Sequence, residues 1–123
     1  MKIICIGRNY TEHISELKND KPDDPVVFIK PDSSVLPKSR PFVIPEFSSE
    51  VHHEVELLVK INKLGKYIQP QFANKYYQKI GLGIDFTARD LQSKLKAKGL
   101  PWEKAKGFDG ATVIGKKWFD KAD

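Results

Sequence analysis

Hydrophobic and polar residues alternate over residues 50–61, which read EVHHEVELLVKI. This period of two predicts a β-strand. One face of the strand carries Val51, His53, Val55, Leu57, Val59 and Ile61, and we expect it to be the core side. The other face carries Glu54 and Glu56, whose side chains lie roughly 7 Å apart because a strand rises about 3.3 Å per residue.

The neighbouring carboxylates of Glu54 and Glu56 have two interpretations. If their face is open to water, solvent screens their repulsion and the segment is a half-exposed strand. If their face lines a cleft, one group is protonated or a cation lies between them. The strand taken alone favours the half-exposed strand over a metal site.

The rest of the chain contains shorter patterns of the same kinds. Further strands are predicted at residues 2–7, 26–31, 42–44, 80–86 and 111–114. Helices are predicted at residues 11–18 and 69–77, and a third begins at Thr87, which we expect to cap it with Asp90 at the third helical position. Loops are predicted at residues 19–25, which contain two prolines, and at the glycine-rich residues 104–110. Together the elements predict an α+β, mainly β fold in one domain.

Composition narrows the class of protein. With 40% apolar and 30% charged residues, the chain is expected to be soluble and globular. No run of about 18 apolar residues is present, and the N-terminus is too lightly charged for a signal peptide, so we expect no membrane segment. The single cysteine, Cys5, fits a reducing cytoplasm and is expected to be buried and inert.

The net charge of +5 raises the question of nucleic-acid binding. The lysines are mostly spaced singly along the chain, and no helix-turn-helix pattern is present. We therefore expect a preference for anionic substrates and no nucleic-acid partner, with nucleic-acid binding kept as a minor alternative.

Several polar residues are candidates for catalysis or for binding a ligand. His13 and Glu16 are three residues apart on a predicted helix, so they form either a general-base dyad or an incidental surface pair. Asp85 interrupts an apolar run, and a buried carboxylate needs a cation or hydrogen-bond donors. Arg89 and Gln92 project from the nearby helix end, toward a site or toward solvent, and Lys30 at the end of its strand has the same two alternatives.

Five blocks of sequence together resemble the fumarylacetoacetate hydrolase family, most closely its small acylpyruvate hydrolase branch. In order, they are residues 7–10 with His13 and Glu16, residues 28–31, residues 52–57, residues 85–92, and residues 99–109. Each block is weak alone, but all five occur in order over the chain. The resemblance implies a mixed β-sheet roll of the type of the family's C-terminal domain, and a homodimer.

The resemblance also assigns roles. Glu54, Glu56 and Asp85 would bind one Mg²⁺ or Mn²⁺, and carboxylate oxygens without a thiol do suit a hard cation. It implies catalytic roles for His13, Glu16 and Lys106, and substrate-binding roles for Arg89, Gln92 and Lys30.

The implied function is hydrolysis of the C–C bond of acylpyruvate-like 2,4-dioxo acids. His13, oriented by Glu16, would take a proton from water, and cleavage would leave a pyruvate enolate held by the metal and Lys106. Oxaloacetate decarboxylation would use the same enolate, and isomerisation or hydration of 2-hydroxyhepta-2,4-diene-1,7-dioate-like acids remains open.

The resemblance covers only the N-terminal part of the family's catalytic domain, which residues 1–123 would form without its later strands. We therefore expect exposed apolar faces and strand edges. An inactive fragment or an interaction module is the alternative to an enzyme.

Overall fold

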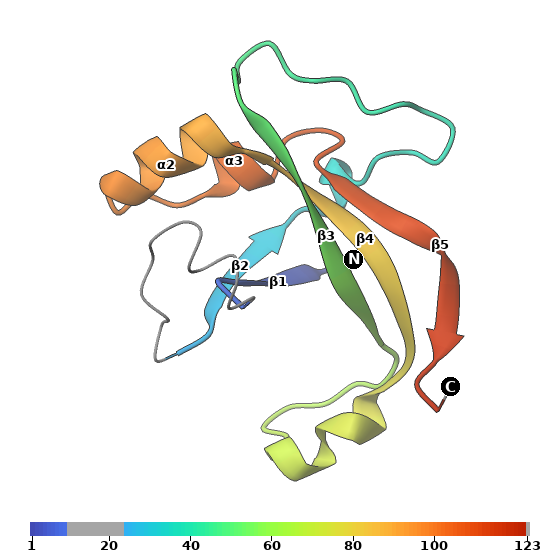
Figure 1. The fold of residues 1–123 in the computed structure, drawn as a ribbon. Helices are drawn as coiled ribbons and strands as arrows, with labels where there is room; N and C mark the ends of the chain where they lie inside the picture. The colour runs from blue at the N-terminus through green and yellow to red at the C-terminus, as the bar shows by residue number, and fades with distance from the viewer. Residues whose placement is uncertain (10–23, 123) are drawn as a thin grey trace.

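The computed structural model describes residues 1–9 and 24–122. The described residues form two antiparallel sheets (Figure 1). The smaller sheet pairs β1 (Ile3–Gly7) with β2 (Val26–Lys30), and the larger has the order β3 (Val51–Ile61), β4 (Tyr77–Ala88), β5 (Thr112–Asp120). The helical segments are η1 (Asp32–Ser34), η2 (Pro70–Tyr76), α2 (Arg89–Ala97) and α3 (Glu103–Lys106). The fold class predicted from the sequence is confirmed.

The β3–β4 hairpin is the longest feature of the molecule. In Figure 1 it runs from α2 and α3 at one end to η2 at the other. Its antiparallel register places His52 opposite Thr87, Glu54 opposite Asp85, and Glu56 opposite Gly83. The glycine is required for close packing, since a Cβ atom at Gly83 would lie 2.5 Å from the Val113 carbonyl oxygen.

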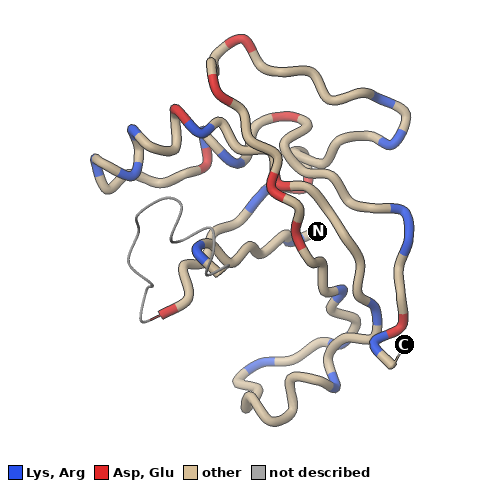
Figure 2. The backbone as a smooth tube through the Cα atoms, viewed as in Figure 1, with Lys and Arg blue, Asp and Glu red and all other residues tan. Residues whose placement is uncertain are grey.

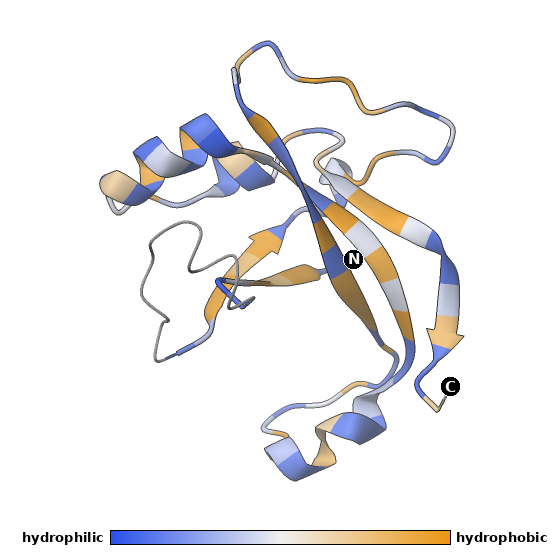
Figure 3. Ribbon diagram, viewed as in Figure 1, coloured by the Kyte–Doolittle hydropathy of each residue, from blue (hydrophilic) through white to orange (hydrophobic). Residues whose placement is uncertain are grey.

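The orientation predicted for β3 is wrong. Val55, Leu57 and Ile61 are 60%, 59% and 65% exposed, whereas Glu54 and Glu56 are half-buried. The carboxylate face turns inward because buried cations lie against it, as described below. Apolar residues run along both sheets (Figure 3), yet the fully buried apolar side chains among the described residues are only those of Ala88, Ala105 and Ala111.

Three local predictions also need correction. No strand forms at residues 42–44, where the Phe42 ring instead stacks on Phe86 with 3.6 Å between centroids. Of residues 104–110, predicted as a turn, the first three belong to α3, whereas residues 107–110 do form bends and turns. Thr87 lies within β4 and does not cap α2. The N-cap of α2 is Ala88, and no side-chain hydrogen bond caps this helix.

The helix predicted at residues 11–18 lies outside the described residues, and so do His13 and Glu16. No helix in the described part of the chain is long and apolar enough to span a membrane.

Candidate functional site

Glu54 and Asp85 form the centre of a charged cluster on neighbouring strands. Both accept hydrogen bonds from the ammonium group of Lys106, at 2.9 Å to Glu54 Oε2 and 2.7 Å to Asp85 Oδ2. The third proton of Lys106 goes to Thr87 Oγ1 at 2.7 Å, so all three donors of this buried ammonium are used. One cation therefore bridges two carboxylates that the hairpin places opposite each other.

Lys30 is a second buried cation in the cluster. It ends β2, is 1% exposed, and donates to Asp85 Oδ1 and, at 2.8 Å, to the Ala111 carbonyl. Of the two alternatives for Lys30, the structure shows the inward one. It also confirms that the Asp85 carboxylate is buried with cations as partners.

Arg89 and Gln92 complete the cluster from the first turns of α2. Arg89 donates from Nη2 to Glu54 Oε1 and from Nη1 to Gln92 Oε1, and both side chains are buried. A third bond runs from Arg89 Nε to His52 Nδ1 at 3.1 Å. These residues therefore line the cluster and are not a solvated surface pair.

The start of α2 is fastened to the start of β3 by short-range bonds. The backbone N–H of Arg89 donates to the Glu50 carbonyl at 2.8 Å. The carboxylate of Asp90 accepts from Ser48 Oγ at 2.6 Å and from the Ser49 backbone N–H at 3.1 Å. This link fixes where the Arg89 side chain leaves the backbone.

Burial and charge act against each other on the ionisable groups. Burial would raise the pKa of Glu54, but Lys106 and Arg89 hold that pKa below its usual value of 4.5. Because its pKa is lowered, Glu54 is held as a carboxylate. Burial lowers the pKa of Lys30, and the adjacent Asp85 opposes this lowering only in part. In Figure 2 acidic segments of β3 and β4 lie close to the basic end of β2.

Cys5 is half-buried near the cluster, and its thiol stays protonated. Burial, followed by the charge of Asp85, raises the pKa of this thiol to about 11. A thiol with that pKa is a poor nucleophile and a poor metal ligand at neutral pH.

The donor atoms fit a hard divalent ion, although the described residues contain no group of three or more His, Cys, Asp or Glu side chains arranged to hold one. Glu54 and Asp85 direct carboxylate oxygens at one ammonium group, and oxygen atoms are the ligands preferred by Mg²⁺ and Mn²⁺. Glu56 shares their side of the sheet two residues along β3 and opposes Gly83. The metal-ligand roles of Glu54, Glu56 and Asp85 stay predictions.

Three groups of the cluster were not predicted from the sequence: Thr87 as a partner of Lys106, the Ala111 carbonyl, and His52. Thr87 had a usable signal, because it lies two residues after Asp85 in a strand and so shares its face. The Ala111 carbonyl had none, since a backbone acceptor carries no side-chain signature.

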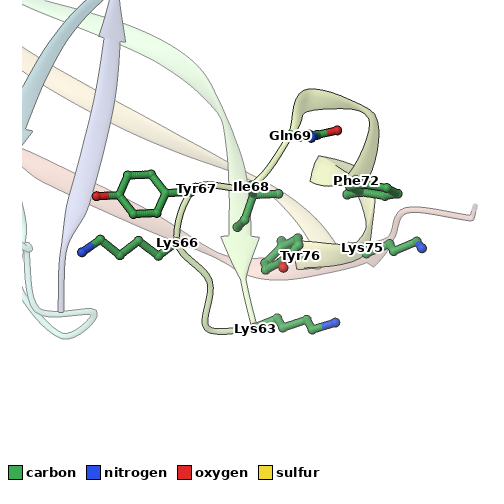
Figure 4. A pocket seen from close by; sticks show the side chains of 8 residues that line it. All are labelled: Lys63, Lys66, Tyr67, Ile68, Gln69, Phe72, Lys75 and Tyr76. Carbon is green, nitrogen blue, oxygen red and sulfur yellow. The ribbon is translucent and has the colours of Figure 1, made fainter.

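Two hollows differ in their relation to this cluster. One of about 500 Å³ is lined by residues 51–56 and Arg89, and it opens beside Glu54. The other, of about 430 Å³, lies at the far end of the hairpin and is lined by lysines and aromatic rings (Figure 4). The lysines there point away from one another, with Lys66 on one side and Lys63 and Lys75 on the other. They do not converge on a ligand, so we place the functional site at the hollow beside Glu54.

Comparison with known proteins identifies the family. The family described as fumarylacetoacetate (FAA) hydrolase C-terminal matches residues 2–123. The chain belongs to this family, as its sequence blocks indicated.

Its relatives include enzymes of 2-oxo acid chemistry. Oxaloacetate tautomerase YcgM of Escherichia coli (strain K12) is 41% identical over 92% of this chain and 52% of its own length. The mitochondrial oxaloacetate decarboxylase of Dictyostelium discoideum is 47% identical over 88% of this chain and 50% of its own. The chain thus spans about half the length of the curated relatives it matches.

Solved structures agree on the fold. The fumarylpyruvate hydrolase of Pseudomonas aeruginosa, in complex with Mn²⁺ and pyruvate, superposes with a TM-score of 0.89 at 31% identity, covering 100% of this chain and 55% of that one. A fumarylacetoacetate hydrolase family protein of Yersinia pestis CO92 gives a TM-score of 0.90 at 39% identity, over 99% and 56% of the two chains. The described sheets are therefore part of the family's C-terminal-domain fold.

Proposed function

We propose that the charged cluster belongs to an active site that forms and holds the enolate of a small 2-oxo acid, with oxaloacetate as the leading substrate. The observation that carries the proposal is the packing of Lys30, Arg89 and Lys106 around Glu54 and Asp85 in a buried setting. Fixed cations in a site with little water stabilise developing negative charge better than solvent does.

Glu54, Glu56 and Asp85 are the residues that would hold Mg²⁺ or Mn²⁺. The bound ion would supply Lewis-acid polarisation of the substrate carbonyl. The support is the oxygen-only donor set together with the Mn²⁺ bound by the Pseudomonas aeruginosa relative.

The remaining groups divide the work of binding and proton transfer. Arg89 offers a planar guanidinium to a substrate carboxylate, with Gln92 fixing one of its arms. Two of the three donors of Lys106 are now directed at Glu54 and Asp85. If those carboxylates held a metal ion instead, a donor of Lys106 would be released for the oxygen that gains charge as the enolate forms. Lys30 keeps Asp85 in place. His13, oriented by Glu16, would remove the proton from the carbon beside the keto group and return it to oxygen.

The reaction proposed first is keto–enol tautomerisation of oxaloacetate, supported by the names of the tautomerase relatives. Cleavage of acylpyruvates is the second candidate, supported by the fumarylpyruvate hydrolase neighbour with its bound pyruvate. In that reaction His13 would deprotonate water rather than carbon, and the water oxygen would bond to the more distant carbonyl carbon. The C–C bond of that carbon would then break, leaving its electron pair on the pyruvate enolate and the acyl group as a carboxylic acid. Decarboxylation of oxaloacetate leads to the same enolate.

We further propose that residues 1–123 are the N-terminal part of one catalytic domain that works as a homodimer. The length of the relatives, about twice that of this chain, supports the first statement.

The direct test follows the ultraviolet absorbance of the oxaloacetate enol after adding the protein with Mn²⁺. We expect metal-dependent acceleration of enol–keto exchange, and Lys106→Met should reduce it by about 10²-fold because one oxyanion donor is lost. Lys104→Met, at an exposed position of the same helix, is the matched control and should leave the rate unchanged. An equal loss in both variants, or a rate independent of metal, would contradict the proposal. Pyruvate release measured in parallel separates decarboxylation from tautomerisation.

A further inference from the structure

The imidazole of His52 connects the charged cluster to a carboxylate outside it. Its Nδ1 accepts a hydrogen bond from Arg89 Nε at 3.1 Å, and its Nε2 lies 2.7 Å from Glu50 Oε1. Arg89 is buried, whereas the side chains of His52 and Glu50 are 42% and 56% exposed. A continuous chain of bonds therefore runs from solvent through His52 and Arg89 to Glu54.

The identity of the donors fixes the tautomer of this histidine. A guanidinium N–H group can only donate, so Nδ1 of His52 must accept and carries no proton. The ring proton then sits on Nε2 and is donated to the Glu50 carboxylate. The other tautomer would set two donors against each other at Nδ1 and two acceptors against each other at Nε2.

We propose that His52 is a positioning residue for Arg89, and that Glu50 selects the tautomer in which His52 can do so. Arginine has a long flexible stem, and its planar group is oriented only when several of its N–H directions are satisfied. Here Nε is held by His52, Nη1 by Gln92 and Nη2 by Glu54. Of these acceptors, His52 is the one on the stem side, so it sets the plane in which the two terminal arms point.

Glu50 holds the same arginine by a second route. Its backbone carbonyl accepts from the Arg89 N–H at 2.8 Å, while its side chain orients the ring that meets Nε. The backbone and the Nε atom of Arg89 are thus both tied to the segment where β3 begins, the backbone through Glu50 and Nε through His52. The importance of this arrangement for turnover rests on the function proposed above, but its geometry does not.

The test is ¹⁵N nuclear magnetic resonance of the whole chain, read at His52 and at Arg89 Nε. We expect an Nε2–H tautomer for His52 and slow solvent exchange of the Arg89 Nε–H. In His52→Phe, which keeps a ring but has no acceptor, exchange should accelerate about tenfold because a hydrogen bond from a charged group is lost. His52→Asn places an amide oxygen near the position of Nδ1 and should restore exchange to within about threefold of the parent. His53→Phe, on the opposite face of β3, is the matched control and should change nothing.

Activity measured on the same variants separates this inference from the proposed function. If the chain turns over oxaloacetate, kcat should fall about tenfold in His52→Phe and recover in His52→Asn. An Nδ1–H tautomer, or unchanged exchange at Arg89 Nε in His52→Phe, would overturn the positioning role. The expected exchange pattern in a chain without turnover would uphold the positioning of Arg89 and count against the proposed function alone.

Discussion

Asp85 shows at the scale of single residues why the cluster is built from charges. Its carboxylate is buried and contacts both Lys30 and Lys106. Buried ion pairs recover their desolvation cost only when their geometry and remaining hydrogen bonds are good, so they add little net stability compared with apolar packing. Breaking such a pair is costly, however, because it leaves a buried charge. The cluster is therefore better explained by function than by stability.

The contact between Lys30 and the buried Asp85 predicts how replacing Lys30 changes the free energy of unfolding. Lys30→Met should lower the free energy of unfolding by about 3 kcal/mol, since Asp85 would lose one of its two cations. Combining Lys30→Met with Asp85→Asn should cost less than the sum of the single changes, because the unpaired charge is then gone. Urea titration measures both, with Lys38→Met at an exposed site as the control. Strict additivity would show that the two side chains do not interact.

At the scale of elements, the β3–β4 hairpin creates the cluster through its register. β3 could be predicted from its period and β4 from its apolar run, and so could the presence of acidic residues on each. Their register could not, because it depends on which residues pair across the turn. The inward face of β3 was assigned incorrectly for a related reason. Alternation shows that a strand has two faces, but partners such as Lys30 and Lys106 decide which face is covered.

The same limits explain the remaining differences. Thr87 and Asp90 have the spacing of a helix cap, yet the buried ammonium of Lys106 binds Thr87 and the serines before β3 bind Asp90. Long-range partners outweighed the local signal. The neighbourhood of Arg89 and Gln92, one turn apart on α2, could be predicted from their spacing. The contacts of Arg89 with Glu54 and His52 could not, because these partners lie more than 30 residues away along the chain.

The link between Asp90 and the serines predicts a pH dependence. The hydrogen bond from Ser48 and the backbone N–H of Ser49 lower the pKa of Asp90 from 3.8 to about 2. A lowered carboxyl pKa contributes stability above the unfolded value, and this contribution is lost as pH falls from about 3.8 toward 2. The melting temperature of the parent should therefore exceed that of Asp90→Asn at pH 6, and the difference should shrink below pH 4. A constant difference across this range would show that the Asp90 charge is not involved.

At the scale of the whole molecule, both sheets present apolar side chains to solvent. Val55, Leu57 and Leu82 are exposed on the larger sheet, and Ile4 and Val27 on the smaller one. Contiguous apolar surface of this kind marks interaction sites or causes aggregation. The exposure expected from the sequence analysis is confirmed by the structure.

This surface predicts association in solution. Light scattering after gel filtration should show an average mass that rises with protein concentration. Replacing Leu57 and Ile61 on β3 with lysine should reduce the association, because charges on an exposed strand oppose contact between sheets. Lys38→Glu and Lys104→Glu, at exposed sites off the sheet, serve as a matched double change and should have no such effect. A monomer at all concentrations would show that the apolar face does not mediate contacts.

We propose that Glu54 and Asp85 meet where a divalent ion and a 2-oxo acid bind. Anomalous diffraction from a crystal soaked with Mn²⁺ and oxalate, an analogue of the pyruvate enolate, would reveal such an ion. We predict one strong Mn²⁺ peak within coordination distance of carboxylate oxygens of Glu54 and Asp85, with oxalate bound to the ion and facing Lys106. A peak elsewhere, or no peak with both carboxylates still paired to Lys106, would contradict the claim.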